Sequence, residues 1–303
     1  VKANSKGILS SLVWALIGKL KKKTNVNSRC ETFVLLTSYI NSFAQDQILY
    51  KTVDTTQLYL TVYPSAIKEP NKKSPAIVFF FGGGWNSGTV KQFEPQALYF
   101  RQRGMVCILV DYRVKEKQKT TPFESLKDAK SAIRYIREHA NELHIDPSKI
   151  IAAGGSAGGH LAAATAIIND YNESTDNTAI SCTPDALVLF NPVFDNGPGG
   201  YGYERIGEAY KNFSPLHNIK SGAPHTIVFL GDKDHLVPVE TAKYYKTIME
   251  KVKSRCDLFV YEGQGHGFFN YKNLEYFKKT VSETDTFLQS LGYLNKAPFI
   301  EIN

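Results

Sequence analysis

A serine between glycines is the clearest candidate for a reactive side chain in this sequence. Ser156 stands in the pattern Gly-x-Ser-x-Gly, after the apolar run KIIAA and before GHLAAATAII, which has the composition of a helix. A serine on a sharp turn between a strand and a helix is exposed, and the flanking glycines let the strand and the helix approach each other. The alternative, a phosphate-binding turn, would carry the lysine of a P-loop, which is absent here. The pattern predicts that Ser156 is a nucleophile.

His266 is the predicted base for this nucleophile. A hydroxyl is a weak nucleophile until a neighbouring group takes its proton. His266 lies between Gly265 and Gly267, just after the last predicted strand, as a residue on a loop at the carboxyl edge of the sheet would. Because a histidine must be neutral to accept a proton, activity is expected to rise through about pH 6 to 7.

Two aspartates follow the preceding predicted strand, and one of them is expected to orient His266. A catalytic triad needs an acid that holds the imidazole in one tautomer and stabilises its charged form. Asp234, in GDKDHLVP, is the preferred candidate because it lies farther along the loop, whereas Asp232 is expected to turn or cap the chain. Asp195, in NPVFD after another strand, is a rival, since that loop can also present an acid to the same histidine.

Three consecutive glycines follow the apolar run VFFF at residues 78–81, which leads directly into GGGW. Glycine has no Cβ, so the backbone can come close to a substrate, although three glycines forgo packing and cost backbone entropy. Acyl transfer passes through a tetrahedral oxyanion, which needs N–H donors about 3 Å away. We expect the N–H groups of Gly83, Gly84 and Ala157 to form this oxyanion hole.

Short apolar runs that alternate with amphipathic stretches predict the elements that would position these residues. Residues 48–63 alternate apolar and polar side chains around a polar turn, as a β-hairpin does, and residues 123–143 carry apolar side chains at helical spacing. Strands buried on both faces and separated by helices predict a mostly parallel sheet with helices on both sides, in one α/β domain. The other expected strands are residues 76–81, 105–112, 150–153, 186–191, 226–230 and 257–261.

The positive charge of the chain is concentrated in its first 44 residues. Of a net charge of +7 for 303 residues, these 44 carry +6, from seven Lys and Arg residues and one Glu, which leaves +1 for the rest. A nearly neutral body has no general affinity for nucleic acid. The same segment holds a basic run, an apolar stretch at residues 32–43 and Ser42-Phe43-Ala44, which has the form of a signal-peptidase site. We expect a leader cleaved after Ala44, a single domain over residues 45–303, and a secreted or periplasmic location.

The remaining composition is that of a soluble globular protein, at 43% hydrophobic and 21% charged residues. No apolar run approaches the roughly 20 residues that span a bilayer. The spacing of the four cysteines does not resemble a metal site, so no metal is expected. Cys107 is expected to be a buried small hydrophobe, whereas pairing of Cys182 with Cys256 is left open by the sequence.

Taken in order, the motifs FGGGW, DYRV, GGSAGGH, GDKDHLVP and GQGHGF resemble those of α/β-hydrolase-fold serine esterases. The most similar groups are the hormone-sensitive-lipase-like carboxylesterases and the acetyl-xylan and feruloyl esterase-like enzymes. The resemblance runs over residues 74–291, about seven-tenths of the chain. It implies an α/β-hydrolase fold with the triad Ser156, Asp234 and His266, and ester hydrolysis without a cofactor.

Two departures from the resemblance bear on the substrate. Phe81 stands where the lipase-like group usually has a histidine, so the glycine loop must be held by other hydrogen bonds. The segment after Asn191 is short, which predicts a short lid and no large cap domain, and argues against long-chain lipids. The residues expected to contact the substrate, each of which could equally serve in packing, are Trp85, His160, Tyr201, Tyr203 and Phe268.

These observations predict a serine esterase that releases small acyl groups, acetyl first and feruloyl second, from esters of carbohydrates or other alcohols. The expected partner is a small-molecule or polysaccharide ester, and the oligomeric state is left open. An exopeptidase or an arylformamidase with the same triad is the first alternative. A hydrolase-fold protein that only binds is the second, and the intact serine, histidine and acid argue against it.

Overall fold

The computed structural model describes residues 45–67, 69 and 72–296. The predicted leader, residues 1–44, lies outside the described residues, so its cleavage stays a prediction.

The described residues form one mixed sheet in the order β1-β2-β4-β3-β5-β6-β7-β8. β1 and β2 are the predicted hairpin, and β2 pairs antiparallel with β4. All pairs from β4 through β8 are parallel, which confirms the mostly parallel sheet. The strands are β1 (Asp46–Val53), β2 (Thr56–Tyr63), β3 (Ser74–Phe80), β4 (Val106–Val110), β5 (Ile145–Gly155), β6 (Ala186–Phe190), β7 (His225–Gly231) and β8 (Cys256–Tyr261).

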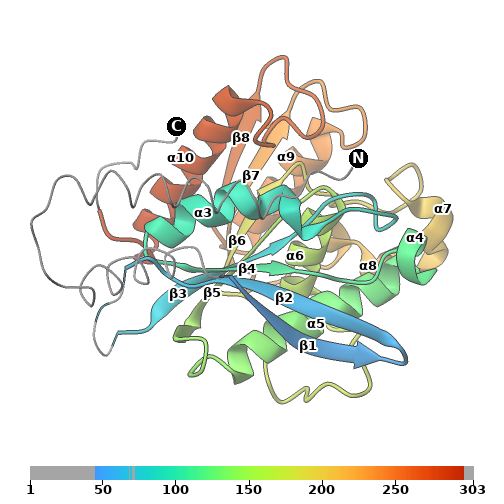
Figure 1. Ribbon diagram of the computed structural model, residues 1–303. Helices are drawn as coiled ribbons and strands as arrows, with labels where there is room; N and C mark the ends of the chain where they lie inside the picture. Colours follow the sequence, from blue (N-terminus) through green and yellow to red (C-terminus); the bar gives the residue numbers. More distant parts are fainter. Residues whose placement is uncertain (1–44, 68, 70–71, 297–303) are drawn as a thin grey trace, which may run out of the picture. The chain divides into compact units, whose positions relative to one another are not determined.

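Helices cover both faces of this sheet and divide its core into two layers. Side chains of α5 (Pro122–Glu138), α6 (Ala157–Ile167) and α9 (Val239–Lys251) belong to one buried cluster. Side chains of α3 (Glu94–Gln102) and α10 (Leu274–Ser290) belong to the other. In Figure 1, α3 lies above β3 and β4 and α5 below them, and α10 and α9 lie on opposite sides of β7 and β8. Such a three-layer arrangement buries both faces of the parallel strands.

The predicted helix at residues 123–143 is shorter in the structure. α5 begins after Thr121, which forms a capping box with Glu124, and ends at Glu138. Apolar spacing continues to Leu143, but the helix ends at its C-cap His139, with φ of −94° and ψ of 20°. The chain then turns as far as His144, which adopts a left-handed conformation with φ of 56°. This turn lets β5 begin at Ile145.

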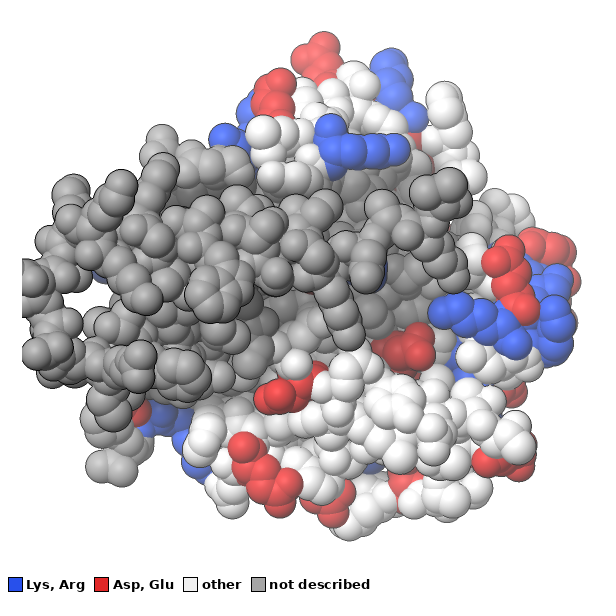
Figure 2. All heavy atoms as spheres, viewed as in Figure 1, with Lys and Arg blue, Asp and Glu red and all other residues white. Residues whose placement is uncertain are grey.

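The connection between β6 and β7 consists of short helices, as expected for a short lid. It contains α7 (Tyr203–Ile206), η3 (Gly207–Ala209), α8 (Tyr210–Phe213) and η4 (Pro215–His217). Two further short helices among the described residues are η2 (Val90–Phe93) and α4 (Lys115–Gln118). Figure 2 shows acidic and basic side chains interspersed where α4 and α7 lie. Within the described part of the chain, no helix is both long and apolar enough to cross a membrane.

Candidate active site

The candidate catalytic residues come from loops at the carboxyl ends of four parallel strands. The glycine loop follows β3, Ser156 follows β5, Asp234 follows β7 and His266 follows β8. In parallel sheets these ends lie at one edge, where binding sites form. β3 and β5 are neighbours, as are β7 and β8, so the topology groups the residues in two pairs.

Ser156 occupies a strained turn between β5 and α6. Its backbone has φ of 55° and ψ of −120°, and a side chain at positive φ carries a conformational cost of about 1–3 kcal/mol. The turn is held from both sides, because the Ser156 N–H donates to the Phe190 carbonyl at 2.9 Å and the Ser156 carbonyl accepts from Val193 N–H at 3.2 Å. The neighbouring strand β6 thus fixes the direction of the serine side chain.

The glycines of the pattern are needed for close packing around this turn. A Cβ on Gly158 would lie 2.1 Å from the Phe80 carbonyl oxygen, and a Cβ on Gly154 would lie 2.3 Å from the Gly158 carbonyl oxygen. Both are backbone atoms that cannot rotate away. The missing side chains let α6 start directly against the end of β3.

Ser156, His266 and Asp234 are brought together as the sequence predicts. The Ser156 Oγ lies 2.9 Å from His266 Nε2, and His266 Nδ1 lies 2.7 Å from Asp234 Oδ2. The Asp234 side chain is fully buried, whereas that of His266 is 25% exposed. Burial acts to raise the pKa of Asp234, but hydrogen bonds from His266 and from the Leu236 and Val237 N–H groups outweigh it and lower this pKa. Asp234 is therefore an ionised carboxylate at neutral pH.

The two rival acids lie in other hydrogen-bonding roles. Asp232 lies in the predicted turn, where the Asp234 N–H donates to the Gly231 carbonyl at 3.3 Å, and its side chain accepts from the Gly263 N–H of the loop after β8 at 2.7 Å. Asp195 accepts from Gly197 N–H at 2.8 Å and lies 3.9 Å from His217. The structure thus places Asp234, and neither rival, on His266.

Three backbone N–H groups near Ser156 are candidates for the oxyanion hole. Within the described residues, the N–H groups of Gly83, Gly84 and Ala157 donate to no hydrogen-bond acceptor. The N–H of Gly82 is different, because it donates to the side-chain oxygen of Gln92 at 2.6 Å. The loop itself requires glycine, since Gly83 and Gly84 have φ of 124° and 63°. Their roles as donors stay predictions that this geometry allows.

Phe81, the departure noted in the sequence, is held by packing and by its backbone. Its ring stacks on Tyr112 at a centroid distance of 4.0 Å, and the Tyr112 hydroxyl donates to the Phe81 carbonyl at 2.6 Å. On the other side of the loop, Arg205 donates to the Gly84 carbonyl at 2.6 Å and lies over the Trp85 ring. No motif in the sequence marked Arg205 or Gln92, and their positions follow only from the fold.

Asn191 is a further residue beside the triad that sequence reasoning missed. It directly follows β6, is fully buried and has φ of 33°. Its Nδ2 lies 3.1 Å from His266 Nε2 and 3.2 Å from Nδ1, so the amide contacts the imidazole across its face. This contact limits the rotation of His266. The one available signal was the position of Asn191 at the end of a buried strand.

Three of the residues predicted to contact the substrate are buried, which corrects that prediction. Trp85, His160 and Phe268 are 1%, 0% and 4% exposed. His160 packs edge-on against Trp85 at 5.1 Å, and its Nε2 lies 3.0 Å from the Phe213 carbonyl oxygen. Aromatic side chains next to a glycine loop support it from beneath as readily as they line a cleft. Tyr201 and Tyr203 are partly exposed, so a role in binding stays open for them.

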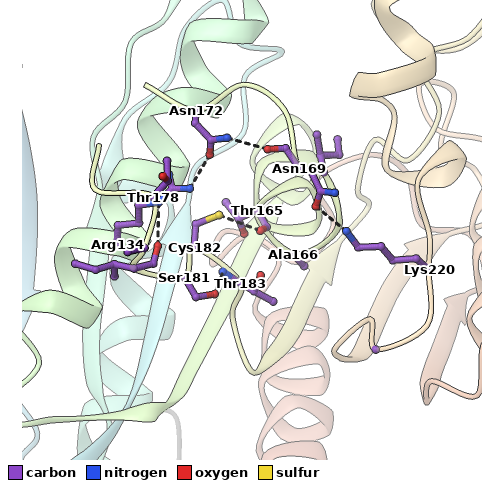
Figure 3. A pocket seen from close by; sticks show the side chains of 14 residues that line it. Arg134, Thr165, Ala166, Asn169, Asn172, Thr178, Ser181, Cys182, Thr183 and Lys220 are labelled. Atoms are coloured by element: carbon purple, nitrogen blue, oxygen red, sulfur yellow. Dashed lines mark hydrogen bonds between the residues drawn. The ribbon is translucent and has the colours of Figure 1, made fainter. Parts of the chain in front are cut away.

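A cavity lies away from the triad, at the end of α6 opposite Ser156, with a volume of about 490 Å³ (Figure 3). Its polar side chains are engaged with one another, as Arg134 with Asn172 at 2.6 Å and Lys220 with Asn169 at 2.7 Å. Cys182 also lines it, and Cys182 and Cys256 are both free thiols, so they do not form a disulfide. In the part of the chain that the structure describes, no cluster of side chains has the composition of a metal site.

Comparison with known proteins shows relatives that are esterases. The family model described as BD-FAE matches residues 61–195. Esterase LipC of Mycobacterium tuberculosis is 28% identical over 221 residues, 66% of this chain and 54% of the relative. The acetylxylan esterase of Xylanibacter ruminicola is 26% identical over 241 residues, 73% of this chain and 46% of the relative. The chain thus spans about half the length of the curated relatives it matches.

The similarity to solved structures is higher. Thermogutta terrifontis esterase 2, in a form phosphoramylated by tabun, is 43% identical with a TM-score of 0.80, and the match covers 84% of this chain and 98% of that one. Its propionate-bound form is 42% identical with a TM-score of 0.79, and covers 85% and 98%. The match to this structure includes nearly all of that esterase.

Proposed function

Because the chain belongs to the α/β-hydrolase-fold serine esterases, we propose that it hydrolyses carboxylic esters through an acyl-enzyme on Ser156. One observation carries the proposal: an unbroken line of contacts from Asp234 through His266 to the Ser156 hydroxyl. This line ends beside N–H groups that have no acceptor within the described residues. A nucleophile, a base, an orienting acid and donors for an oxyanion are the parts that acyl transfer requires.

In the acylation step, Ser156 Oγ attacks the carbonyl carbon of the ester while its proton moves to His266 Nε2. The carbonyl oxygen takes up the negative charge, which we expect the N–H groups of Gly83, Gly84 and Ala157 to stabilise. Asp234 stabilises the imidazolium that forms and keeps Nδ1 as the protonated nitrogen. When the intermediate collapses, the bond to the alcohol oxygen breaks, and His266 returns the proton to that oxygen.

In the deacylation step, water replaces the alcohol. His266 Nε2 takes a proton from the water, whose oxygen attacks the acyl carbon, and the second intermediate uses the same N–H donors. Its collapse breaks the bond to Ser156 Oγ, which recovers its proton from His266. The carboxylic acid leaves, and the enzyme returns to its starting state. The chemistry needs only side chains and backbone groups of this chain.

We further propose that the acyl group is small, with acetyl first, and that the alcohol is a carbohydrate. Two comparisons support this substrate class. One relative is named as an acetylxylan esterase, and the structurally similar Thermogutta esterase has been solved with propionate and with butyrate bound. The short helices between β6 and β7, in place of a large apolar cap, agree with small acyl groups.

Replacing the nucleophile tests the reaction itself. We expect Ser156→Ala to lower kcat for p-nitrophenyl acetate by about a million-fold, because no other group supplies the attacking oxygen. The wild type should also be labelled by a fluorophosphonate probe and the variant should not. Unchanged turnover in Ser156→Ala would end the proposal.

A panel of substrates tests the acyl group and the alcohol. Release of acetate and of ferulate from natural polysaccharides is compared with hydrolysis of p-nitrophenyl esters from acetate to decanoate. We expect the highest kcat/KM for acetyl to butyryl esters, and measurable acetate release from acetylated xylan. A preference for decanoate, or for aminoacyl anilides or N-formylkynurenine over all esters, would contradict the proposed substrate class.

A further inference from the structure

Two amide side chains connect the glycine loop to the loop that carries His266. The Gly82 N–H donates to Gln92 Oε1 at 2.6 Å, and Gln92 Nε2 donates to Asn270 Oδ1 at 3.1 Å. Asn270 Nδ2 in turn donates to the carbonyl oxygen of Gly267 at 2.7 Å. We call Gln92 and Asn270 the amide bridge. Its two members are 178 residues apart in the chain, and their link joins the residues after β3 to those after β8.

The direction of every hydrogen bond in the amide bridge is set by its two ends. At one end stands a backbone N–H, which can only donate, so Gln92 must turn its oxygen to Gly82. At the other end stands a backbone carbonyl, which can only accept, so Asn270 must turn its nitrogen to Gly267. The middle bond then runs from the Gln92 nitrogen to the Asn270 oxygen. All three bonds point the same way, an arrangement in which each bond polarises the next.

Both ends of the amide bridge lie next to the reacting groups. A Cβ on Gly82 would lie 3.4 Å from the Ser156 Cβ, so this residue lies beside the nucleophile. The next two residues, Gly83 and Gly84, supply the proposed oxyanion donors. At the other end, Gly267 directly follows His266 and has φ of 79°. Holding Gly267 in place therefore constrains the backbone from which the His266 side chain projects.

Among the residues that the structure describes, Gln92 is the one acceptor for the Gly82 N–H, and the side chain that precedes Gly82 is the apolar Phe81. A shift of about 1 Å in the placement of reacting groups can cost roughly a hundred-fold in rate. Donors in an oxyanion hole must meet the developing charge at 2.7–3.1 Å. A link that fixes the glycine loop relative to the His266 loop therefore acts on the chemical step.

We propose that Gln92 and Asn270 are positioning residues that hold the oxyanion donors and the catalytic histidine in register. This inference rests on the proposed esterase function of the same site. It assigns to neither residue any contact with substrate. Loss of the amide bridge is expected to weaken binding of the transition state more than binding of the ester in its ground state, so kcat falls while KM stays nearly constant.

The test compares Gln92→Met, Asn270→Leu and the double variant with the wild type on p-nitrophenyl acetate. Both substitutions keep the approximate volume and remove the polar atoms. We expect each single variant to lower kcat by about 10- to 100-fold, with KM within about threefold. The double variant should have about the same kcat as the less active single variant, because either substitution breaks the same chain of hydrogen bonds. Inhibition by a trifluoromethyl ketone, which Ser156 converts to a tetrahedral oxyanion, should weaken by the same factor as kcat.

Gln96→Met is the matched control. Gln96 lies one helical turn beyond Gln92, is fully buried, and its Nε2 reaches the Phe269 carbonyl at 3.5 Å, outside the amide bridge. The Gln96→Met variant is expected to have a lower melting temperature, while its kcat per active site stays within twofold of the wild type. Active sites are counted by titration with paraoxon, so that unfolded protein does not lower the apparent kcat.

The possible outcomes separate this inference from the proposed function. If the wild type hydrolyses the ester and Ser156→Ala does not, the proposed function holds. The kcat values of the amide-bridge variants then decide the inference separately. A titrated kcat within twofold of the wild type in both Gln92→Met and Asn270→Leu would overturn the inference, as would a Gln96→Met variant that loses kcat equally. If Ser156→Ala keeps its activity, the function and the inference fall together.

Discussion

Asp234 and Asp195 are two carboxylates on neighbouring loops, and only the first lies on His266. We expect Asp234→Asn to lower kcat by about ten-thousand-fold, because an amide at this place favours the wrong tautomer of the imidazole. Asp195→Asn is the matched control and should keep kcat within a few-fold, since Asp195 contacts Gly197 and lies near His217. Kinetics of both purified variants decide the assignment. The reverse order of effects would identify Asp195 as the acid.

His160 makes the stability of the protein depend on pH. Burial lowers the pKa of this histidine to about 3, although the contact with the Phe213 carbonyl partly opposes the shift. The unfolded chain, with a histidine pKa near 6.5, then binds more protons than the folded chain between about pH 3 and 6.5. Stability from this residue is therefore complete above pH 6.5 and is lost as the pH falls toward 3.

Urea unfolding at pH 7 and pH 5 measures this loss. For His160 alone, the wild type should lose about 2 kcal/mol between the two pH values, at roughly 1.4 kcal/mol per pH unit. His160→Gln keeps a donor for the Phe213 carbonyl but cannot titrate, so its loss should be smaller by that amount. The comparison uses differences within each protein, so a lower absolute stability of the variant does not matter. Equal losses in both proteins would show that His160 titrates normally.

Which residues the sequence could predict depended on whether a local pattern marks them. Ser156 and His266 stand between glycines at strand ends, and Asp234 follows a strand in the order Ser-Asp-His. No local pattern shows whether a given side chain will be buried. Aromatic residues and a histidine near the site were therefore expected to contact the substrate. His160 does not, because α6 is buried along its whole length. Gln92 and Asn270 acquire a role only through a contact across 178 residues, which one sequence does not show.

At the scale of elements, the contact between β3 and the start of α6 positions the nucleophile. A Cβ on Gly158 would meet the carbonyl oxygens of Phe80 and Phe81 at 2.1 and 2.3 Å. We expect Gly158→Ala to force β3 and α6 apart, at a cost of about 1–3 kcal/mol in unfolding free energy. Activity should fall by at least a hundred-fold, since the glycine loop continues from Phe81. Thermal unfolding and ester hydrolysis measure the two effects.

Gly265→Ala is the control for this substitution. Gly265 also flanks a triad residue, but the nearest atom to its Cβ would be the Lys233 carbonyl oxygen, at an ordinary 3.7 Å. Its melting temperature should match that of the wild type. If Gly158→Ala were equally stable and active, close contact at the start of α6 would not be what the Gly-x-Ser-x-Gly pattern provides.

The elements themselves were well predicted because their signals are local. Buried parallel strands are short apolar runs, and all six expected runs overlap strands β3 to β8. The misplaced boundary is the end of α5, where apolar spacing continued past Glu138. There the C-cap at His139 and the turn that leads into β5 decide the boundary, and both depend on how the chain packs.

Across the whole molecule, a buried cluster of charges attaches the β1–β2 hairpin to the parallel part of the fold. Asp128 of α5 lies 2.7 Å from both Lys51 of β1 and Arg113 after β4. Glu173, from the segment after α6, lies 3.0 Å from Lys51 and 3.2 Å from Arg113. Two cations and two anions balance, and the Asp128 side chain is completely buried. Ion pairs thus link the antiparallel hairpin at the edge of the sheet to α5.

Removing one charge from this cluster is expected to destabilise the entire fold. Asp128→Asn leaves two buried cations with one anion, and breaking a buried ion pair in this way costs about 3–5 kcal/mol. Glu275→Gln removes one partner of a pair with Lys279 that has the same 2.7 Å separation but exposed side chains, so solvent screens it and the unfolding midpoint should not move. Urea unfolding of both variants at neutral pH gives the comparison. Equal midpoints for the two variants would mean that the buried charges do not hold the hairpin, and that apolar contacts of β1 and β2 alone attach it to the sheet.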